Sequence, residues 1–225
     1  MQILVVNING LRYTAPLLRD LQAQTAPCHV TLWDQGSTET GTDALLDEAE
    51  SWAAVERHPV NKDLNRVWNL WAARATEPLL CFLNNDTRVP PNFVADTEAV
   101  FKAERDVGIV VHATNVVWPS QADLDYCLPR DHFVQGHDFT IRRALYVPIP
   151  GDLRMWGGDD WLFGHVYARG WLAAVVLSSP ITHHRGRSHR FFQGDRDADV
   201  LAWRRYGFPD LPHRPELTHG RSDAA

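Results

Sequence analysis

Apolar runs alternate with segments of helical periodicity along the first part of the chain. Three short apolar runs predict buried strands at 3–6, 30–33 and 79–83, and another strand is predicted at 55–58. Apolar positions three and four residues apart predict helices at 14–24, with Pro16 in its first turn, and at 41–54 and 61–75. Strands that alternate with helices are typical of a parallel sheet covered by helices on both faces.

The second part of the chain continues this alternation less regularly. Helices are expected at 93–104 and 159–168 and strands at 108–112, 133–141 and 172–177, whereas 114–130 has no clear period and predicts a loop or lid. The chain beyond Ser188 is polar and rich in arginine. We therefore expect one domain over residues 1–190 and a C-terminal extension over 191–225, of which roughly the last ten residues are disordered.

The strand predicted at 79–83 ends abruptly in Asn84, Asn85 and Asp86. In open α/β sheets, ligands bind outside the carboxyl ends of the strands. A carboxylate placed there suits a hard divalent cation, which takes oxygen ligands and often keeps water and substrate phosphates as its other partners. Asp86 is therefore a candidate metal ligand, and the alternative is an ordinary turn rich in Asn and Asp.

Charge and cysteine content narrow the classes of function. The chain has 225 residues and a net charge of -6, which gives no indication of nucleic-acid binding, although a local basic patch would be compatible with it. Its three cysteines form no paired motif, which favours free thiols and a cytoplasmic location. The chain begins directly with a predicted strand, and no apolar run approaches the ~20 residues of a transmembrane helix. We therefore expect neither a signal peptide nor a transmembrane segment.

Seven short motifs follow one another in a fixed order. They are VVNING at 5–10, DQGST at 34–38, the pair Asn61 and Asn69, LNNDT at 83–87, GHDFTIRR at 136–143, WGGDD at 156–160 and HHRGRS at 183–188. Together they resemble the motifs of family 2 glycosyltransferases, and LNNDT resembles the form of the D-x-D motif seen in rhamnosyltransferase-like members. The resemblance implies an α/β protein with the GT-A (Rossmann-like) fold, in which a mixed, mostly parallel central sheet carries helices on both faces.

The same resemblance implies a nucleotide-diphosphate sugar as donor substrate, with UDP or dTDP favoured as its nucleotide. It assigns Asn7, Asp34 and Asn61 to the nucleotide, Asn85 to the ribose, and Asp86 to a cation, Mn²⁺ or Mg²⁺. Amides stand where the family's D-x-D motif has an acid, which weakens the charge of the expected site. The structural alternatives stay open: Asp34 would cap its own turn, and Asn7 and Asn61 would do the same.

His183 and His184 follow the last predicted strand and precede an arginine-rich stretch. A histidine in this position can complete the coordination of a metal ion. We expect His183 to bind the metal and His184 to point away. The alternative is a solvated basic turn.

Asp159 and Asp160 are the candidates for a catalytic base, because inverting transfer needs a carboxylate to take the proton of the acceptor hydroxyl. Both lie at the start of a predicted helix, so the alternative is that they only stabilise its N-terminus. Alignment on Trp156 and the two glycines after it favours Asp160, whereas counting back from Gly170 favours Asp159. We favour Asp160.

The sequence thus leads to the hypothesis of a metal-dependent, inverting glycosyltransferase that moves a hexose or deoxyhexose to a hydroxyl of a glycan or protein acceptor. The alternative is a catalytically degenerate domain that binds a sugar nucleotide or glycan without transfer, since amides replace acids at 84–85. A nucleotidyltransferase is disfavoured because the loop at 7–12 has one glycine and no lysine. Trp118, Trp156 and Trp161 are candidates for a sugar-binding surface, although tryptophans usually belong to the core.

Overall fold

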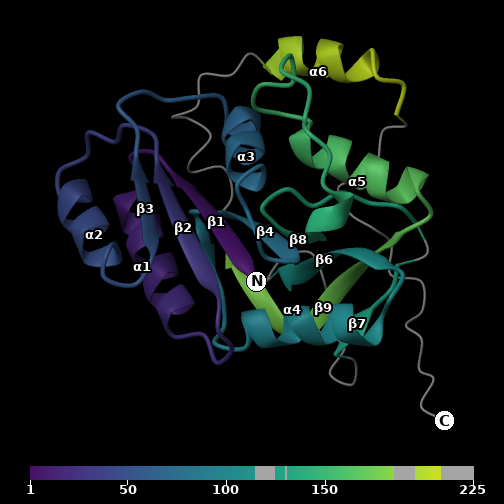
Figure 1. Ribbon diagram of the computed structural model, residues 1–225, viewed down its shortest axis with the longest axis horizontal. Helices are drawn as coiled ribbons and strands as arrows, with labels where there is room; N and C mark the ends of the chain where they lie inside the picture. The colour runs from purple at the N-terminus through teal and green to yellow at the C-terminus, as the bar shows by residue number, and fades with distance from the viewer. Residues whose placement is uncertain (115–124, 130, 185–195, 209–225) are drawn as a thin grey trace.

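The computed structural model describes residues 1–114, 125–129, 131–184 and 196–208. Its strands form one sheet in the order β3-β2-β1-β4-β8-β6-β9-β5, with β7 paired to β9 (Figure 1). The strands are β1 (Gln2–Asn7), β2 (His29–Asp34), β3 (Ala54–Arg57), β4 (Leu79–Asn84), β5 (Thr87–Arg88), β6 (Val107–Thr114), β7 (Tyr126–Cys127), β8 (Asp138–Arg142) and β9 (Leu172–His183). The helices are α1 (Leu11–Gln22), α2 (Thr42–Ala49), α3 (Leu64–Ala72), α4 (Phe93–Ala103), α5 (Gly158–Ala168) and α6 (Arg196–Arg204), and Arg143–Leu145 form a 3-10 turn.

The first half of the sheet is parallel and the second half is mixed. β1 pairs in parallel with β2 and β4, and β3 extends this block beyond β2. β8 is antiparallel to both β4 and β6, while β6 and β9 are parallel. The short strands β5 and β7 run antiparallel to β9. The predicted mixed, mostly parallel sheet is confirmed.

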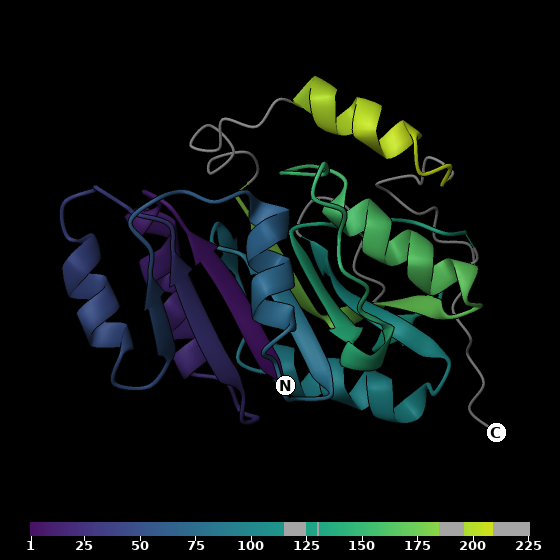
Figure 2. The same ribbon diagram turned by 45° about the horizontal axis from the view of Figure 1, so that its top comes forward.

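Helices cover both faces of the sheet, as Figure 2 shows. α1, α2 and α4 pack on one face through apolar side chains such as Leu17 and Phe101. α3, α5 and α6 pack on the other face through side chains such as Trp68 and Phe163. Because successive side chains of a strand point to opposite faces, a strand between two such layers is apolar at most of its positions. The unbroken apolar runs of the sequence are therefore the central strands.

Two helices begin at positions other than those predicted. α1 begins at Leu11, so the prediction that Pro16 lies in its first turn is wrong; Pro16 is inside the helix, where its missing N–H removes one helical hydrogen bond. α3 begins at Leu64, so Asn61 lies in the preceding loop, exposed, and not in the helix as predicted. Periodicity locates the buried face of a helix but says little about exposed residues at its ends.

β9 is longer than predicted and contains His183, which the sequence placed after the strand. Its register with β6 jumps between Val176 and Ile181, and this irregularity accommodates Pro180, which has no N–H to donate. Beyond this bulge β9 pairs with β5, and Thr87 lies opposite His183. The proline that suggested the end of the strand therefore only interrupts it.

β8 begins at Asp138, so residues 133–137 form a loop where a strand was predicted. Phe133 and Val134 of this loop are buried in the same core as α5, which explains their strand-like pattern.

α6 was not predicted, and it packs onto the core through Ala202 and Trp203. The domain boundary at residue 190 stays a prediction, and the end of the chain expected to be disordered lies outside the described residues, as does most of the loop at 114–130. Among the described residues, no helix is both long and apolar enough to cross a membrane. All three cysteines are free thiols, and burial raises the pKa of Cys127 to about 11.

Candidate functional site

The carboxyl ends of β1, β2 and β4 lie side by side at one edge of the sheet (Figure 1). In the parallel register of β1 and β2, Asn7 lies opposite Asp34. β4, on the other side of β1, ends at Asn84, and the chain continues directly to Asn85 and Asp86. The polar residues that the sequence singled out therefore meet where ligands of open α/β sheets bind.

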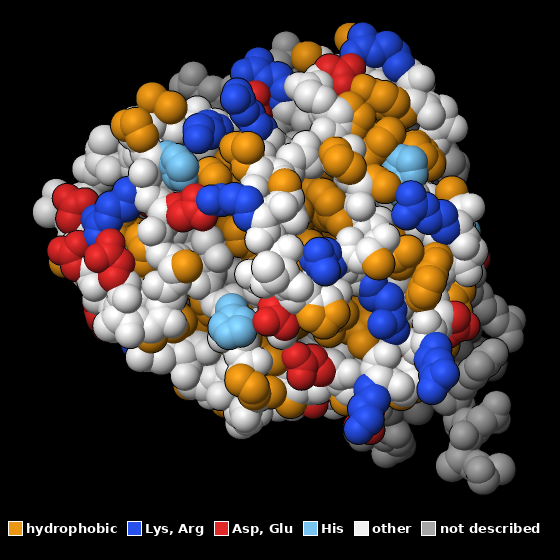
Figure 3. All heavy atoms as spheres, viewed as in Figure 1, with side chains coloured by type: hydrophobic (Ala, Val, Ile, Leu, Met, Phe, Trp, Pro, Cys, Tyr) orange, Lys and Arg blue, Asp and Glu red, His pale blue; other side chains and the backbone are white. Residues whose placement is uncertain are grey.

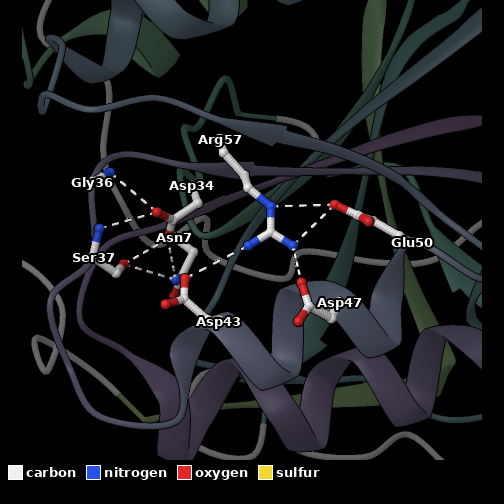
Figure 4. A network of polar contacts seen from close by, with 8 residues as sticks. All are labelled: Asn7, Asp34, Gly36, Ser37, Asp43, Asp47, Glu50 and Arg57. Atoms are coloured by element: carbon white, nitrogen blue, oxygen red, sulfur yellow. Dashed lines mark hydrogen bonds and ion pairs between the residues drawn. The ribbon is translucent and has the colours of Figure 1, made fainter.

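The Asp34 carboxylate holds the loop that follows β2 (Figure 4). Its Oδ2 accepts hydrogen bonds from the N–H groups of Gly36 at 3.1 Å and Ser37 at 3.0 Å. Its Oδ1 accepts from the Ser37 hydroxyl at 2.5 Å and from Asn7 Nδ2 at 2.8 Å. The turn-capping role that the sequence left open is therefore present. A contact between Asp34 and a nucleotide stays a prediction.

The other acidic side chains in Figure 4 surround an arginine. Arg57, the last residue of β3, has its Nη2 2.5 Å from Asp47 Oδ1 and 2.9 Å from Glu50 Oε1, and its Nη1 3.6 Å from Asp43 Oδ1. These exposed ion pairs tie α2 to β3. The four side chains pair with one another and are not part of the polar cluster around Asn7.

Asn7 links the end of β1 to α1 and to the segment after β4. Its Oδ1 accepts hydrogen bonds from Thr14 Oγ1 at 2.7 Å and from Asn85 Nδ2 at 3.2 Å. Asn85 Nδ2 also lies 3.0 Å from Thr14 Oγ1. A Cβ atom on Gly10 would lie 2.3 Å from Asn85 Nδ2, so this approach requires glycine. Asn7 and Asn85 therefore hold the edge together, and their contacts with a nucleotide and its ribose stay predictions.

Asn61 is not brought into this cluster, because it is exposed in the loop between β3 and α3. Its neighbour Lys62 is bound by Gln35, whose Oε1 accepts from the Lys62 N–H at 2.7 Å and whose Nε2 donates to the Lys62 carbonyl at 2.9 Å. Gln35 joins the loops that follow β2 and β3. Sequence reasoning missed this role; the signal was a glutamine where the family pattern at 34–38 has a shorter asparagine.

We expect Asn7→Ala to lower the free energy of unfolding by about 2–3 kcal/mol, because it removes the partner of several buried polar groups. Urea denaturation measures the change. Asn61→Ala is the matched control, and a change within about 0.5 kcal/mol is expected at that exposed position. Equal effects of the two substitutions would contradict the structural role of Asn7.

Asp86 is 1% exposed and follows the tip of β4. Neither oxygen of its carboxylate has a hydrogen-bond partner among the residues that the structure describes. His183 Nε2 lies 3.3 Å from Asp86 Oδ1, and the His184 N–H donates to the Asp86 carbonyl at 2.9 Å. The ring of His184 lies against Tyr13, with centroids 5.4 Å apart. Of the two histidines, His183 is therefore the one whose side chain faces Asp86.

The surroundings of Asp86 fit a divalent cation. A buried carboxylate without hydrogen-bond donors is costly, and a bound cation removes that cost. Among the described residues, however, no group of three or more His, Cys, Asp or Glu side chains is arranged to hold a metal ion. Asp86 and His183 would therefore supply only part of a coordination sphere. Substrate phosphates and water would supply the remaining ligands, which is common for hard divalent cations.

His137 and Asp138, which sequence reasoning missed, extend this cluster. The His137 ring stacks on His183 with centroids 4.4 Å apart, and its Nε2 lies 3.2 Å from Asp138 Oδ1. Burial raises the pKa of Asp138 to about 7, against the opposing effect of hydrogen bonds from the His112 N–H and Gln135. The available signal was this ionisable pair at the start of the GHDFTIRR motif.

Asp159 and Asp160 occupy the first turn of α5, as predicted. A Cβ atom on Gly136 would lie 2.0 Å from Asp159 Oδ2, so the Asp159 carboxylate lies directly against the backbone of the loop before β8. The next residue of that loop is His137, which stacks on His183. Consecutive helical residues point about 100° apart, so Asp160 faces a different direction. Of the two acids, Asp159 is the one directed to the segment that reaches the Asp86 cluster.

We expect Gly136→Ala to displace the Asp159 carboxylate. If Asp159, one of the two candidates from the sequence, is the catalytic base, the rate of sugar transfer should fall by about tenfold or more, because small misplacements of catalytic groups are costly. Folding should persist, since the atom that must move is the end of a side chain. Gly151→Ala is the control, because a Cβ atom there meets nothing within 4 Å. Initial rates and melting temperatures of the two variants test this; equal rates would contradict the placement of Asp159.

The three tryptophans proposed for a sugar-binding surface lie in different surroundings. Trp161 packs between α5 and the C-terminal segment, with its ring 5.0 Å from Tyr206 and 5.5 Å from Phe208. Trp156 is 39% exposed and precedes the acidic turn, so it stays a candidate. Trp118 and the arginine-rich stretch after His184 lie outside the described residues.

Comparison with known proteins agrees with this arrangement. The family model described as glycosyl transferase family 2 matches residues 2–143, which is more than half of the chain. A search of curated proteins finds no match. Among solved structures, the mannosyltransferase PcManGT from Pyrobaculum calidifontis, in complex with GDP-Man and Mn²⁺, is similar with a TM-score of 0.69 and 17% identity over 94% of this chain and 65% of its own.

Two further structures share the fold. S. aureus TarS 1-349 in complex with UDP-GlcNAc gives a TM-score of 0.66 at 15% identity, over 83% of this chain and 59% of its own. GalNAc-T7 with UDP, GalNAc and Mn²⁺ gives 0.64 at 17% identity, over 81% of this chain and 43% of its own. The chain thus spans less than two thirds of the length of TarS 1-349 and PcManGT. It has the GT-A fold of these enzymes and belongs to glycosyl transferase family 2.

Proposed function

We propose that the protein is a metal-dependent, inverting glycosyltransferase that moves a sugar from a nucleotide-diphosphate sugar to an acceptor hydroxyl. The observation that carries the proposal is the buried Asp86 carboxylate, which has no hydrogen-bond partner among the described residues and follows the end of β4, the strand paired with β1. Family membership supports the class of reaction.

The donor would bind along the edge formed by β1, β2 and β4. Asn7, Asp34 and Asn85 are proposed to contact the nucleotide and its ribose there. Asn61, which is exposed in the loop after β3, is proposed to reach the nucleotide from outside this cluster. The structures of PcManGT with GDP-Man and of TarS with UDP-GlcNAc support a nucleotide sugar as donor. UDP or dTDP is our proposal for the nucleotide of this chain.

Asp86 and His183 are proposed to hold Mn²⁺ or Mg²⁺ beside the diphosphate. A cation bound there supplies Lewis-acid stabilisation of the charge that develops on the leaving nucleoside diphosphate. The stacked His137 limits the movement of the His183 ring. Neither oxygen of Asp86 is engaged in a hydrogen bond within the described part of the chain, so a cation would displace no donor from them.

Asp159 is proposed as the general base, with Asp160 as the second candidate. A carboxylate at this position would take the proton from the acceptor hydroxyl while the hydroxyl oxygen attacks the anomeric carbon, in a single displacement that inverts the configuration. The N-terminus of α5 stabilises the charged form of a carboxylate in its first turn. The contact of Asp159 with Gly136 supports the choice over Asp160, which alignment of the sequence motif had favoured.

Specificity is proposed at a finer level from the motifs. The LNNDT segment supports a rhamnosyltransferase-like enzyme that transfers a hexose or deoxyhexose, and a glycan or protein is proposed as acceptor. A cytoplasmic location is part of the same proposal, for which the three free cysteines are the support.

A screen of nucleotide sugars tests the function. Thermal stabilisation of the protein by each compound is measured with Mn²⁺ and with EDTA, and release of nucleoside diphosphate is assayed for those that bind. We expect stabilisation by a UDP- or dTDP-sugar in Mn²⁺ and release of the diphosphate. Binding and turnover that persist in EDTA would contradict the metal role, and an absence of stabilisation by any nucleotide sugar would contradict the function.

A degenerate domain that binds a sugar nucleotide without transfer is the second candidate. It is favoured by the amides Asn84 and Asn85, and the Asn85 side chain is engaged with Asn7 and Thr14. Hydrolysis of the donor in the absence of acceptor distinguishes the enzyme from the degenerate domain. An intact catalytic site would transfer the sugar slowly to water, whereas a degenerate site would release the intact sugar nucleotide.

A further inference from the structure

Asp199 of α6 binds the loop that leads into the acidic turn of α5. Its Oδ1 accepts a hydrogen bond from the Arg154 N–H at 3.0 Å. Its Oδ2 accepts from the N–H groups of Met155 at 2.9 Å and Trp156 at 2.8 Å. The residue is 2% exposed. A buried carboxylate that accepts three backbone N–H groups is a strong anchor, because each of these hydrogen bonds is charge-assisted.

The carbonyl groups of the same loop are bound by a different helix. Asn65 of α3 donates through its Nδ2 to the carbonyls of Leu153 at 2.9 Å and Trp156 at 3.4 Å. Its backbone N–H donates to the Arg154 carbonyl at 3.1 Å. The backbone of this loop is therefore held by two helices: α3 binds the carbonyls of Leu153, Arg154 and Trp156, and α6 binds the N–H groups of 154–156.

This loop determines where α5 begins. Gly157 has φ of 77°, a left-handed conformation that favours glycine, and it turns the chain into the helix. A Cβ atom on Gly158 would lie 2.1 Å from Asn65 Oδ1, so the first residue of the helix rests on the Asn65 side chain. Asp159 follows directly and meets Gly136. A shift of the loop would therefore move the Asp159 carboxylate relative to Gly136.

We propose that Asp199 is a positioning residue for sugar transfer, which acts through the loop 154–156 to fix Asp159 at the edge of the sheet. The inference rests on the proposed function for the transfer step. It makes α6, which lies outside the family match at 2–143, part of the catalytic unit. Within the described part of the chain, the hydrogen bonds of Asp199 go to the N–H groups of 154–156 and not to Asp86 or His183, so nucleotide binding should not depend on it.

Asp199→Ala, Asp199→Asn and a matched control, Asp152→Ala, test the proposal. Asp152 accepts a hydrogen bond from Arg205 Nη2 at 2.6 Å and another from Tyr206, so it also joins this region to the C-terminal segment, but at an exposed position. We expect Asp199→Ala to lower kcat by about tenfold or more, with KM for the donor and Kd for the nucleoside diphosphate within about twofold of wild type. Asp199→Asn, which keeps one acceptor oxygen, should be intermediate, and Asp152→Ala should match wild type.

Hydrogen–deuterium exchange gives a readout that does not require activity. The N–H groups of 154–156 should exchange faster in Asp199→Ala than in wild type or Asp152→Ala, while β1 and β2 stay protected. A wild-type protein that transfers no sugar would contradict the proposed function, and exchange would still decide whether Asp199 holds the loop. Three results would overturn the proposal. The first is unchanged exchange of the 154–156 N–H groups in Asp199→Ala, and the second is an unchanged kcat in that variant. The third is a parallel loss of kcat and nucleotide affinity in both Asp199 variants.

Discussion

Replacement of Asp86 by alanine is expected to abolish cation-dependent binding of the nucleoside diphosphate and to lower sugar transfer by about 10²–10³-fold, since a catalytic cation is worth several kcal/mol. The same change should leave the melting temperature in EDTA unchanged or higher. Asp86 is buried, and beyond the approach of His183 Nε2 at 3.3 Å its carboxylate has no hydrogen-bond partner among the described residues, so it costs stability in the absence of a cation. Titration calorimetry with UDP and Mn²⁺, and thermal melts in EDTA, measure both effects.

Two variants make this experiment specific. Asp86→Asn keeps the size of the side chain but removes its charge, and it should lose most of the cation-dependent binding. Asp20→Ala removes the carboxylate that binds Arg88 Nε at 2.5 Å and so loosens the adjacent strand β5 without touching Asp86. If nucleotide binding by Asp86→Ala still depends on Mn²⁺, the cation must bind at residues other than Asp86. An equal loss in Asp20→Ala would assign the effect to β5.

Replacement of Asp159 by asparagine is expected to lower kcat by about 10²–10⁴-fold, the usual contribution of a general base, while Kd for the nucleoside diphosphate stays unchanged. Asparagine keeps the shape of the side chain against Gly136 but cannot take a proton at neutral pH. Asp160→Asn is the matched variant from the same helical turn, and its kcat should fall by less than that of Asp159→Asn. Single-turnover rates and calorimetry separate the chemical step from binding.

A reversed order, with Asp160→Asn the more damaging change, would restore the assignment made from the WGGDD motif. Equal and small effects would mean that neither carboxylate is the base and that both serve the N-terminus of α5. Loss of nucleotide binding in Asp159→Asn would contradict the separation of the acidic turn from the donor site.

The sheet was predictable because its strands are buried on both faces. β1, β2 and β4 are mostly apolar and each ends in a polar residue, so the alternation of strands and helices predicted a sheet covered on both faces. The mixed sheet and the roles of Asn7 and Asp34 were implied by the resemblance to family 2 glycosyltransferases. The ends of the helices were predicted less accurately, because apolar periodicity does not determine whether residues such as Pro16 and Asn61 lie inside a helix or before it. His183 was expected after its strand because Pro180 signals an end, whereas the bulge in β9 allows the strand to continue.

The contacts that orient the candidate site could not be predicted. The approach of Gly136 to Asp159 joins a loop to a helix and depends on how α5 packs. The stacking of His137 on His183 depends on the start of β8 and the end of β9 lying at the same edge of the sheet. Asp199 lies in a polar segment that reads as an extension, and its importance is visible only from its backbone partners at 154–156. Such long-range contacts leave no periodic trace in the sequence.

The central claim is that one edge of the sheet brings together a cation beside a diphosphate, at Asp86 and His183, and a base, at Asp159. A crystal structure with Mn²⁺ and the nucleoside diphosphate that stabilises the protein most, with an anomalous difference map for manganese, tests it most directly. We predict a manganese peak between the Asp86 carboxylate and the diphosphate, with Asp159 facing the vacant position of the sugar. Manganese or nucleotide bound away from Asp86, or an Asp159 carboxylate directed away from the diphosphate, would contradict the account.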